Sequence, residues 1–160
     1  MQIIKVGMAD LQLGKDPCML TTLGLGSCVG ISLYDRSTKI SGMAHVMLPS
    51  SKQARDNTNI AKFADTGIVY LLNSMMKIGA NRSSIVAKLA GGAQMFAFKE
   101  VSDIMRIGDR NVDASKEILS MLKIPVVAED VRGNYGRTIE LYSADGKVQI
   151  KTIGHGTRDI

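Results

Sequence analysis

Cys28 and His45 are the best candidates in this sequence for catalytic residues. The chain holds two cysteines and two histidines, so the choice of reactive side chains is narrow. A thiolate is a strong nucleophile, and an adjacent imidazole can take the thiol proton and later return it to a leaving amine. A cysteine paired with a histidine therefore predicts an amidohydrolase, in which the thiolate attacks an amide carbonyl and the imidazole serves as general base.

The residues around this pair predict a β-hairpin that positions it. Residues 29–34 alternate between apolar and polar side chains, as a half-buried strand does. Residues 35–38 supply turn chemistry, and a second β-rich run over 39–48 is followed by proline. Cys28 immediately precedes the first strand and His45 lies inside the second, so the hairpin brings them close together.

The register of this hairpin decides whether the two side chains meet. If residues 35–38 form the loop, Tyr34 pairs with Lys39, and Cys28 lies directly opposite His45. Directly opposed residues place their Cβ atoms about 4.5–5.5 Å apart on one face, within range of a thiol–imidazole contact. A slip of one residue would turn the two side chains to opposite faces. This loop therefore predicts a direct cysteine–histidine pair.

Three further residues could complete a site around Cys28. Thr22 lies on the preceding strand, and its hydroxyl could orient the imidazole, although threonines in strands commonly only fill a β surface. Gly26 and Ser27 precede the thiol in a glycine-bearing turn, where their backbone N–H groups could stabilise an oxyanion.

His45 itself, viewed alone, could equally be a hydrogen-bonded core histidine.

The remaining candidates for chemistry are weaker. Cys18 has no histidine within local reach, which favours a small packed thiol. His155 lies in a C-terminal Gly-His-Gly segment, whose flexibility would make a poor catalytic base. The glycines over 24–30 follow the spacing G-x-G-x-x-x-G and precede a β pattern, which argues against a dinucleotide loop. No zinc-type spacing of cysteine and histidine occurs, so neither a metal nor a cofactor is expected.

Composition and charge argue against several classes of function. The net charge of +5 comes from scattered Lys and Arg, and with 4% aromatic residues and no Trp a nucleic-acid partner is not expected. Neither a signal peptide nor membrane insertion is expected, because no apolar run approaches about 18 residues and the first residues lack a basic segment before an apolar one. Both cysteines should then be reduced thiols in a cytoplasmic protein.

The rest of the chain predicts an α+β fold of mainly antiparallel strands. At 160 residues, one domain over 1–160 is expected. Runs of strands with only two good helices favour a layered α+β domain over a doubly wound parallel sheet. The other expected elements are a strand at 19–23, an exposed loop at 50–59, a helix capped by Thr58 or Asn59 and ending near Gly79, a buried strand at 85–90, a helix capped by Asn111 or Asp113 and reaching Leu122, a strand at 126–128, and a hairpin of 138–142 with 148–151.

Several segments of the chain match the motifs of one known family. The most specific are LGLGSCVG at 23–30 and GMAHVMLP at 42–49, which contain the reactive pair. Further matches are LAGGAQMF at 89–96, IGDRNV at 107–112 and GNYGR at 133–137, so the resemblance extends over nearly the whole chain. In these motifs the sequence resembles the CheD family, the chemoreceptor glutamine deamidases of bacterial and archaeal chemotaxis.

The resemblance implies an activity, a fold and partners. It implies a protein-glutamine glutaminase that converts selected receptor glutamines to glutamates and releases ammonia through a cysteine thioester. Cys28, His45 and Thr22 match the family's cysteine, histidine and threonine. The implied fold is a layered α/β sandwich similar to bacterial toxin deamidases. The implied partners are the cytoplasmic domain of chemoreceptors and a CheC-type chemotaxis phosphatase, and some family members are credited with receptor methyl-ester hydrolysis.

Two other interpretations stay open at this point. The chain could be a non-catalytic binding module that regulates a CheC-type phosphatase, with Cys28 and His45 serving only for packing. It could also be a redox sensor, in which Cys28 would be oxidised reversibly and would hydrolyse no amide. The substitution Cys28→Ala separates an enzyme from a binding module, because only an enzyme would lose deamidation while keeping its partners.

Overall fold

The described residues form two five-stranded sheets and two α-helices. The structure is a computed structural model that describes residues 1–95 and 106–160, so Phe96 of the matched segment 89–96 lies outside it. The first sheet has the strand order β1-β3-β8-β9-β10, and the second has the order β2-β5-β4-β6-β7. The bounds are β1 Gln2–Lys5, β2 Asp10–Lys15, β3 Cys18–Leu25, β4 Val29–Asp35, β5 Ile40–Val46, η1 Ser51–Gln53, η2 Ile60–Lys62, α1 Ala64–Lys77, η3 Arg82–Ser84, β6 Ile85–Gly91, α2 Ile107–Met121, β7 Val126–Val131, β8 Arg137–Tyr142, β9 Val148–Thr152 and β10 Gly156–Asp159, where η marks a 3-10 turn.

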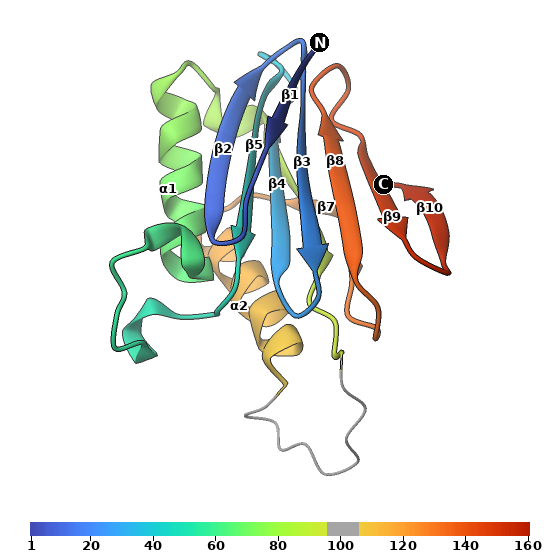
Figure 1. Cartoon of the computed structure of the whole chain (residues 1–160). Helices are drawn as coiled ribbons and strands as arrows, with labels where there is room; N and C mark the ends of the chain where they lie inside the picture. Colours follow the sequence, from blue (N-terminus) through green and yellow to red (C-terminus); the bar gives the residue numbers. More distant parts are fainter. Residues whose placement is uncertain (96–105) are drawn as a thin grey trace.

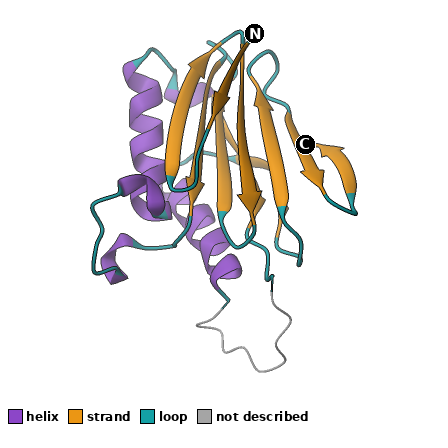
Figure 2. Cartoon of the chain, in the orientation of Figure 1, coloured by secondary structure: helices purple, strands orange, loops and turns teal. Residues whose placement is uncertain are grey.

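The two sheets and the helices are stacked in three layers. Both helices pack on one face of the second sheet, whose other face packs on the first sheet (Figure 1). One apolar cluster, with Val29 and Leu71 among its members, lies between the helices and the second sheet. Another, with Leu25 and Ile139 among its members, lies between the sheets. All strand pairs are antiparallel except β1 with β3 and β6 with β7, so the predicted layered α+β fold is confirmed (Figure 2).

The predicted strands and the C-terminal hairpin are present, but three short strands escaped prediction. β1 and β2 precede the first predicted strand, and β10 follows the last. The four residues of β10 are all exposed, so no apolar periodicity marks them. Such strands are recognised only by the neighbour they pair with, which for β10 is β9 and for β1 is β3.

The first helix begins later than its predicted cap. Asn59 does cap a turn, because its side chain accepts a hydrogen bond from the Ala61 N–H at 3.1 Å. That turn is the 3-10 segment η2, and the chain is extended again at Phe63. Phe63 is fully buried and forms a β-bridge with Leu48, and this contact delays the α-helix to Ala64.

The second helix begins earlier than predicted. α2 starts at Ile107, so Asn111 and Asp113 lie inside the helix instead of capping it. The side chain of Asn111 donates hydrogen bonds to the carbonyl oxygens of Ser27 and Met47. These partners are far away in the sequence, so the residues next to Asn111 do not indicate them. Asparagine and aspartate favour the cap position of a helix, so the predicted start of this helix was several residues too late.

The hairpin of β4 and β5 forms, but its register differs from the predicted one. Gly30, rather than Cys28, lies opposite His45, and Tyr34 pairs with Ser41. The shift moves the pairing by two positions, so Cys28 and His45 still share a face. They are diagonal neighbours instead of a directly opposed pair, and the predicted direct pairing is wrong.

Asp35 is the reason for the shifted register. Its carboxylate accepts hydrogen bonds from the Ser37 N–H at 2.8 Å, the Thr38 hydroxyl at 2.6 Å and the Asn81 N–H at 2.7 Å. Lys39 takes a left-handed conformation with φ of 59° and donates its N–H to the Asp35 carbonyl. Asp35 therefore ends the strand, and the loop begins one residue later than the turn residues suggested.

We expect Asp35→Ala to lower the free energy of unfolding at pH 7 by about 2 kcal/mol. Burial would raise the pKa of Asp35, but hydrogen bonds from Thr38, Asn81 and Ser37 outweigh it and lower the pKa to about 2. The stabilisation is therefore complete above the unfolded-state pKa near 4 and is lost as the pH falls towards 2. Urea unfolding at pH 7 and pH 2.5 checks this, and an equal wild-type advantage at both pH values would contradict it.

Candidate active site

Cys28 and His45 lie on the face of the second sheet that packs against the first. Cys28 immediately precedes β4, and His45 lies opposite Gly30 on β5. Diagonal neighbours in an antiparallel pair are about 7–8 Å apart at Cα. The two side chains form no hydrogen bond with each other, since His45 Nδ1 lies against Thr22 and Nε2 has no partner among the described residues. Cys28 is 8% exposed and His45 is 0% exposed, so Cys28 is the more exposed residue of the pair.

A short chain of hydrogen bonds orients the His45 ring. Thr22 Oγ1 donates to the Val6 carbonyl oxygen at 2.7 Å, and the same Oγ1 lies 2.7 Å from His45 Nδ1. A hydroxyl has one proton to donate and a carbonyl can only accept, so Thr22 must accept from Nδ1–H. His45 Nε2 therefore carries the lone pair, and this buried atom has no hydrogen-bond partner among the described residues. This is the protonation pattern that a general base requires.

Burial keeps both reactive groups uncharged at neutral pH. It lowers the pKa of His45 below the usual value for an imidazole. Burial also raises the pKa of the Cys28 thiol, an effect that the residue's own backbone N–H partly offsets. The resting pair is therefore a thiol and a neutral imidazole, not an ion pair. The thiol proton has to leave during attack on a substrate, which makes the free lone pair of Nε2 necessary.

Two glycines let the chain pass close to the Cys28 loop. Gly91 and Gly92 have φ values of 105° and 68°, and a Cβ on Gly91 would overlap the Cys28 carbonyl oxygen. The Gly92 N–H donates to that oxygen, and the Ala93 N–H donates to the Gly26 carbonyl, both at 2.8 Å. Gly91 and Gly92 therefore pack closely against the backbone of residues 26–28, and this packing fixes the loop that carries the thiol.

The backbone amides near the thiol differ in their availability to an oxyanion. The Gly26 N–H already donates to the Gly24 carbonyl oxygen at 3.0 Å. The carbonyl groups of Gly26 and Ser27 are both held by hydrogen bonds from other parts of the chain. Since the C=O and N–H of one peptide unit point in opposite directions, these bonds also fix the directions of the Ser27 and Cys28 N–H groups. Ser27 therefore suits the donor role better than Gly26.

Sequence reasoning missed two buried polar residues that support this site. Arg137 donates from Nε to Asp130 Oδ1 at 2.8 Å and from Nη1 to the Gly91 carbonyl at 3.4 Å, which ties the two sheets together beside the glycine turn. Its partner Asp130 lies in the other sheet, so the residues around Arg137 in the sequence do not predict this ion pair. Asn111 is 0% exposed on the same helix face as Leu119, and a polar residue on an apolar face is the signal that could have found it.

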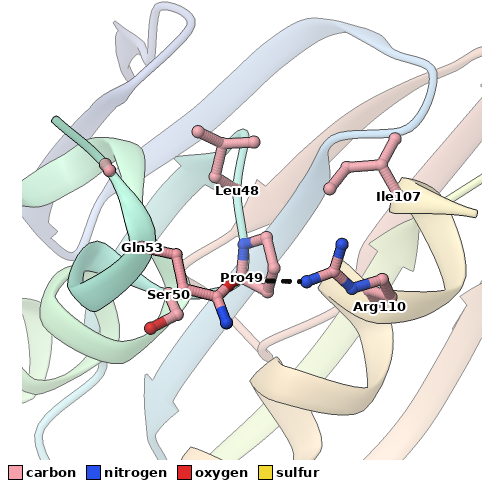
Figure 3. Close-up of a pocket in the computed structure, with 7 residues that line it drawn as sticks. Leu48, Pro49, Ser50, Gln53, Ile107 and Arg110 are labelled. Carbon is pink, nitrogen blue, oxygen red and sulfur yellow. Dashed lines mark hydrogen bonds between the residues drawn. The ribbon is translucent and has the colours of Figure 1, made fainter. Parts of the chain in front are cut away.

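A hollow of about 180 Å³ opens between the segment after β5 and the first turns of α2 (Figure 3). Arg110 Nη2 approaches Gln53 Oε1 at 3.4 Å across it. Met47 and Asn111, which adjoin lining residues in the chain, are joined by a hydrogen bond of 2.9 Å. The hollow therefore borders the residues that hold the Cys28 loop. Its lining is Leu48, Pro49, Ser50, Gln53, Ala54, Ile107 and Arg110.

The other predicted candidates lie elsewhere. Cys18 is a buried free thiol at the end of β3 opposite to Leu25, and its N–H donates to Ser143 Oγ at 2.8 Å. His155 lies in the turn between β9 and β10, far along the chain from the reactive pair, and its ring is stacked on Tyr135 with 4.2 Å between the ring centroids. Among the described residues, no group of three His, Cys, Asp or Glu side chains could hold a metal ion. No helix in that part of the chain is long and apolar enough to cross a membrane.

Comparison with known proteins decides the family. A family model described as CheD chemotactic sensory transduction matches residues 47–152. The chain belongs to the CheD family. A relative from Caldanaerobacter subterraneus subsp. tengcongensis is 59% identical over 159 residues, which cover 99% of this chain and 98% of the relative. One from Lachnoclostridium phytofermentans is 55% identical over 159 residues, which cover 99% of each. Both carry the name "Probable chemoreceptor glutamine deamidase CheD".

The match to the CheD family model begins at residue 47, after Cys28 and His45, so it does not test the roles of these two residues. Two solved structures are similar over part of their length. A Bacillus licheniformis hypothetical protein, YfiH, has a TM-score of 0.49 at 15% identity, covering 76% of this chain and 49% of that one. A Neisseria meningitidis protein of the DUF152 family has a TM-score of 0.47 at 11% identity, covering 84% and 63%.

Proposed function

We propose that this CheD-family protein is a chemoreceptor glutamine deamidase with Cys28 as nucleophile and His45 as general base. The observation that carries the proposal is the unpaired Nε2 of His45, on the sheet face that also holds Cys28. Thr22 fixes the tautomer that leaves this atom unprotonated. The names of relatives at 59% and 55% identity support receptor glutamine as the substrate.

The proposed reaction proceeds through a thioester. His45 Nε2 takes the Cys28 thiol proton while Sγ attacks the side-chain carbonyl carbon of glutamine, and the Ser27 N–H donates to the oxyanion. The imidazolium returns the proton to the amide nitrogen, the C–N bond breaks, and ammonia leaves. Water then loses a proton to His45 and hydrolyses the γ-glutamyl thioester, which gives glutamate and restores the thiol. A glutamate methyl ester would enter the same path with methanol as the leaving group.

The proposal extends to partners and location. The substrate is the cytoplasmic domain of a chemoreceptor, and a CheC-type phosphatase is a second partner, as in the family that the motifs resemble. The two cysteines are free thiols, which agrees with a cytoplasmic protein. The net charge of +5 favours approach to an acidic receptor surface, so turnover on receptor should fall as salt rises.

Peptide mass analysis of a receptor signalling-domain fragment tests the proposed activity directly. Incubation with the protein should convert specific glutamines to glutamates, with ammonia released in equal amount. Absence of conversion with several receptors, from a folded protein that still binds a CheC-type phosphatase, would favour the non-catalytic binding module. Reversible oxidation of Cys28 without amide hydrolysis would favour the redox sensor.

We expect Thr22→Val to lower kcat roughly 10- to 100-fold, because the buried Nδ1–H of His45 would lose its acceptor and the ring its orientation. Valine keeps the β-branched shape, so the packing between the sheets should be preserved. Thr22→Ser keeps the hydroxyl and is the matched control, with kcat expected near that of the wild type. Steady-state deamidation of a receptor peptide measures both, and a valine variant within twofold of the wild type would remove Thr22 from the mechanism.

A further inference from the structure

The side chain of Asn111 joins the two chain segments that carry the reactive pair. Its Nδ2 donates to the Ser27 carbonyl oxygen and to the Met47 carbonyl oxygen, both at 2.9 Å. Ser27 immediately precedes Cys28, and Met47 follows His45 by two residues. Both partners are carbonyl oxygens that can only accept, so the amide nitrogen must face them and the orientation of the carboxamide is determined.

These bonds begin where the strand pairing ends. The last paired residues of β4 and β5 towards the site are Val29 and Val46. Ser27 and Met47 lie beyond that pair, where no β4–β5 ladder bond holds the two segments together. We propose that Asn111 is a positioning residue that sets the separation and orientation of the Cys28 loop and the end of the His45 strand, an inference that rests on the proposed function.

The bond to Ser27 also acts on the thiol. Because the peptide unit is planar, holding the Ser27 C=O towards Asn111 directs the Cys28 N–H the opposite way. That N–H is the group that lowers the pKa of the Cys28 thiol against the effect of burial. Asn111 therefore influences the nucleophile through one rigid peptide plane, without touching its sulfur.

Asn111 is otherwise a poor residue for its place. It lies inside α2, where asparagine is a weaker helix former than leucine, and it is 0% exposed. Its Oδ1 is buried without a hydrogen-bond partner among the described residues, which costs stability. Proteins break such local rules mainly at functional sites and compensate for the cost elsewhere. The two hydrogen bonds from Asn111 to the carbonyl oxygens of Ser27 and Met47 are the compensation that the structure shows.

The test measures the reactivity of the thiol separately from deamidation. In Asn111→Leu, which keeps a similar branched shape but removes both donors, alkylation of Cys28 by iodoacetamide is followed against pH by peptide mapping. We expect the apparent pKa of the Cys28 thiol to rise by about one unit, which is a tenfold lower thiolate fraction below that pKa. Cys18 in the same chain is the internal reference and should not change. On a receptor peptide, kcat should fall roughly 10- to 100-fold, with KM within twofold.

Matched variants separate positioning from a loss of stability. Leu119→Ala and Ser115→Ala alter buried residues of the same helix that donate nothing to Ser27 or Met47, and they should keep the wild-type thiol pKa and kcat despite a lower melting temperature. Asn111→Ala is the second variant if leucine does not fit. An unchanged thiol pKa and kcat in a folded Asn111 variant would overturn the proposal, as would equal losses in Leu119→Ala. Alkylation needs no receptor, so a failure of the proposed deamidase activity would be seen separately.

Discussion

Cys28→Ala is expected to abolish conversion of receptor glutamines, with turnover at least about three orders of magnitude below that of the wild type. Without the thiol no acyl-enzyme can form, and His45 alone would have to activate water against an unactivated amide. The side chain is small and 8% exposed, so its truncation leaves little void and the fold should persist. Peptide mass analysis of a receptor fragment, with thermal unfolding measured in parallel, checks both statements.

Cys18→Ala is the matched control for this experiment, because Cys18 is the other buried thiol of the chain. It should retain deamidation in any preparation that is folded. Receptor binding by Cys28→Ala should be preserved as well. Turnover by Cys28→Ala within tenfold of the wild type would show that the nucleophile has been misassigned.

His45→Gln is expected to lower kcat roughly 10²- to 10⁴-fold, which is the usual contribution of a positioned general base. The burial that raises the pKa of Cys28 leaves the thiol protonated at neutral pH, so it depends on the lone pair of His45 Nε2. Glutamine keeps a side-chain amide that can form hydrogen bonds, but it cannot take a proton. His155→Gln changes the other histidine of the chain and should leave kcat unchanged.

The pH profile of the wild type gives a second measurement of the same role. Burial lowers the pKa of His45, so the imidazole stays unprotonated down to a pH below its usual pKa near 6.5. Activity should therefore hold as the pH falls from 8 to 6.5 and decline only at lower pH, where Nε2 gains a proton. A decline that begins above pH 7 would contradict a depressed imidazole pKa.

The sequence by itself determined the elements whose signals are local. Apolar alternation predicted the strand found as β4 Val29–Asp35, and the Asp-Gly turn predicted the hairpin of β8 and β9. The same local patterns identified Cys28 and His45 as candidates. Each of these conclusions depends on residue types within a few positions of one another, which one sequence displays completely.

Only the tertiary structure decided how these elements meet. The hairpin register depends on Asp35, whose carboxylate is held partly by the Asn81 N–H, a group far along the chain. The contact of Thr22 with His45 joins strands of different sheets, and Asn111 reaches from a helix to two separate carbonyls. Hydrogen bonds have strict requirements of distance and direction, so long-range partners become visible only when the layers are packed. Local sequence patterns were therefore enough to identify the reactive residues. The tautomer of His45, and the burial and relative position of Cys28 and His45, are properties of the whole fold.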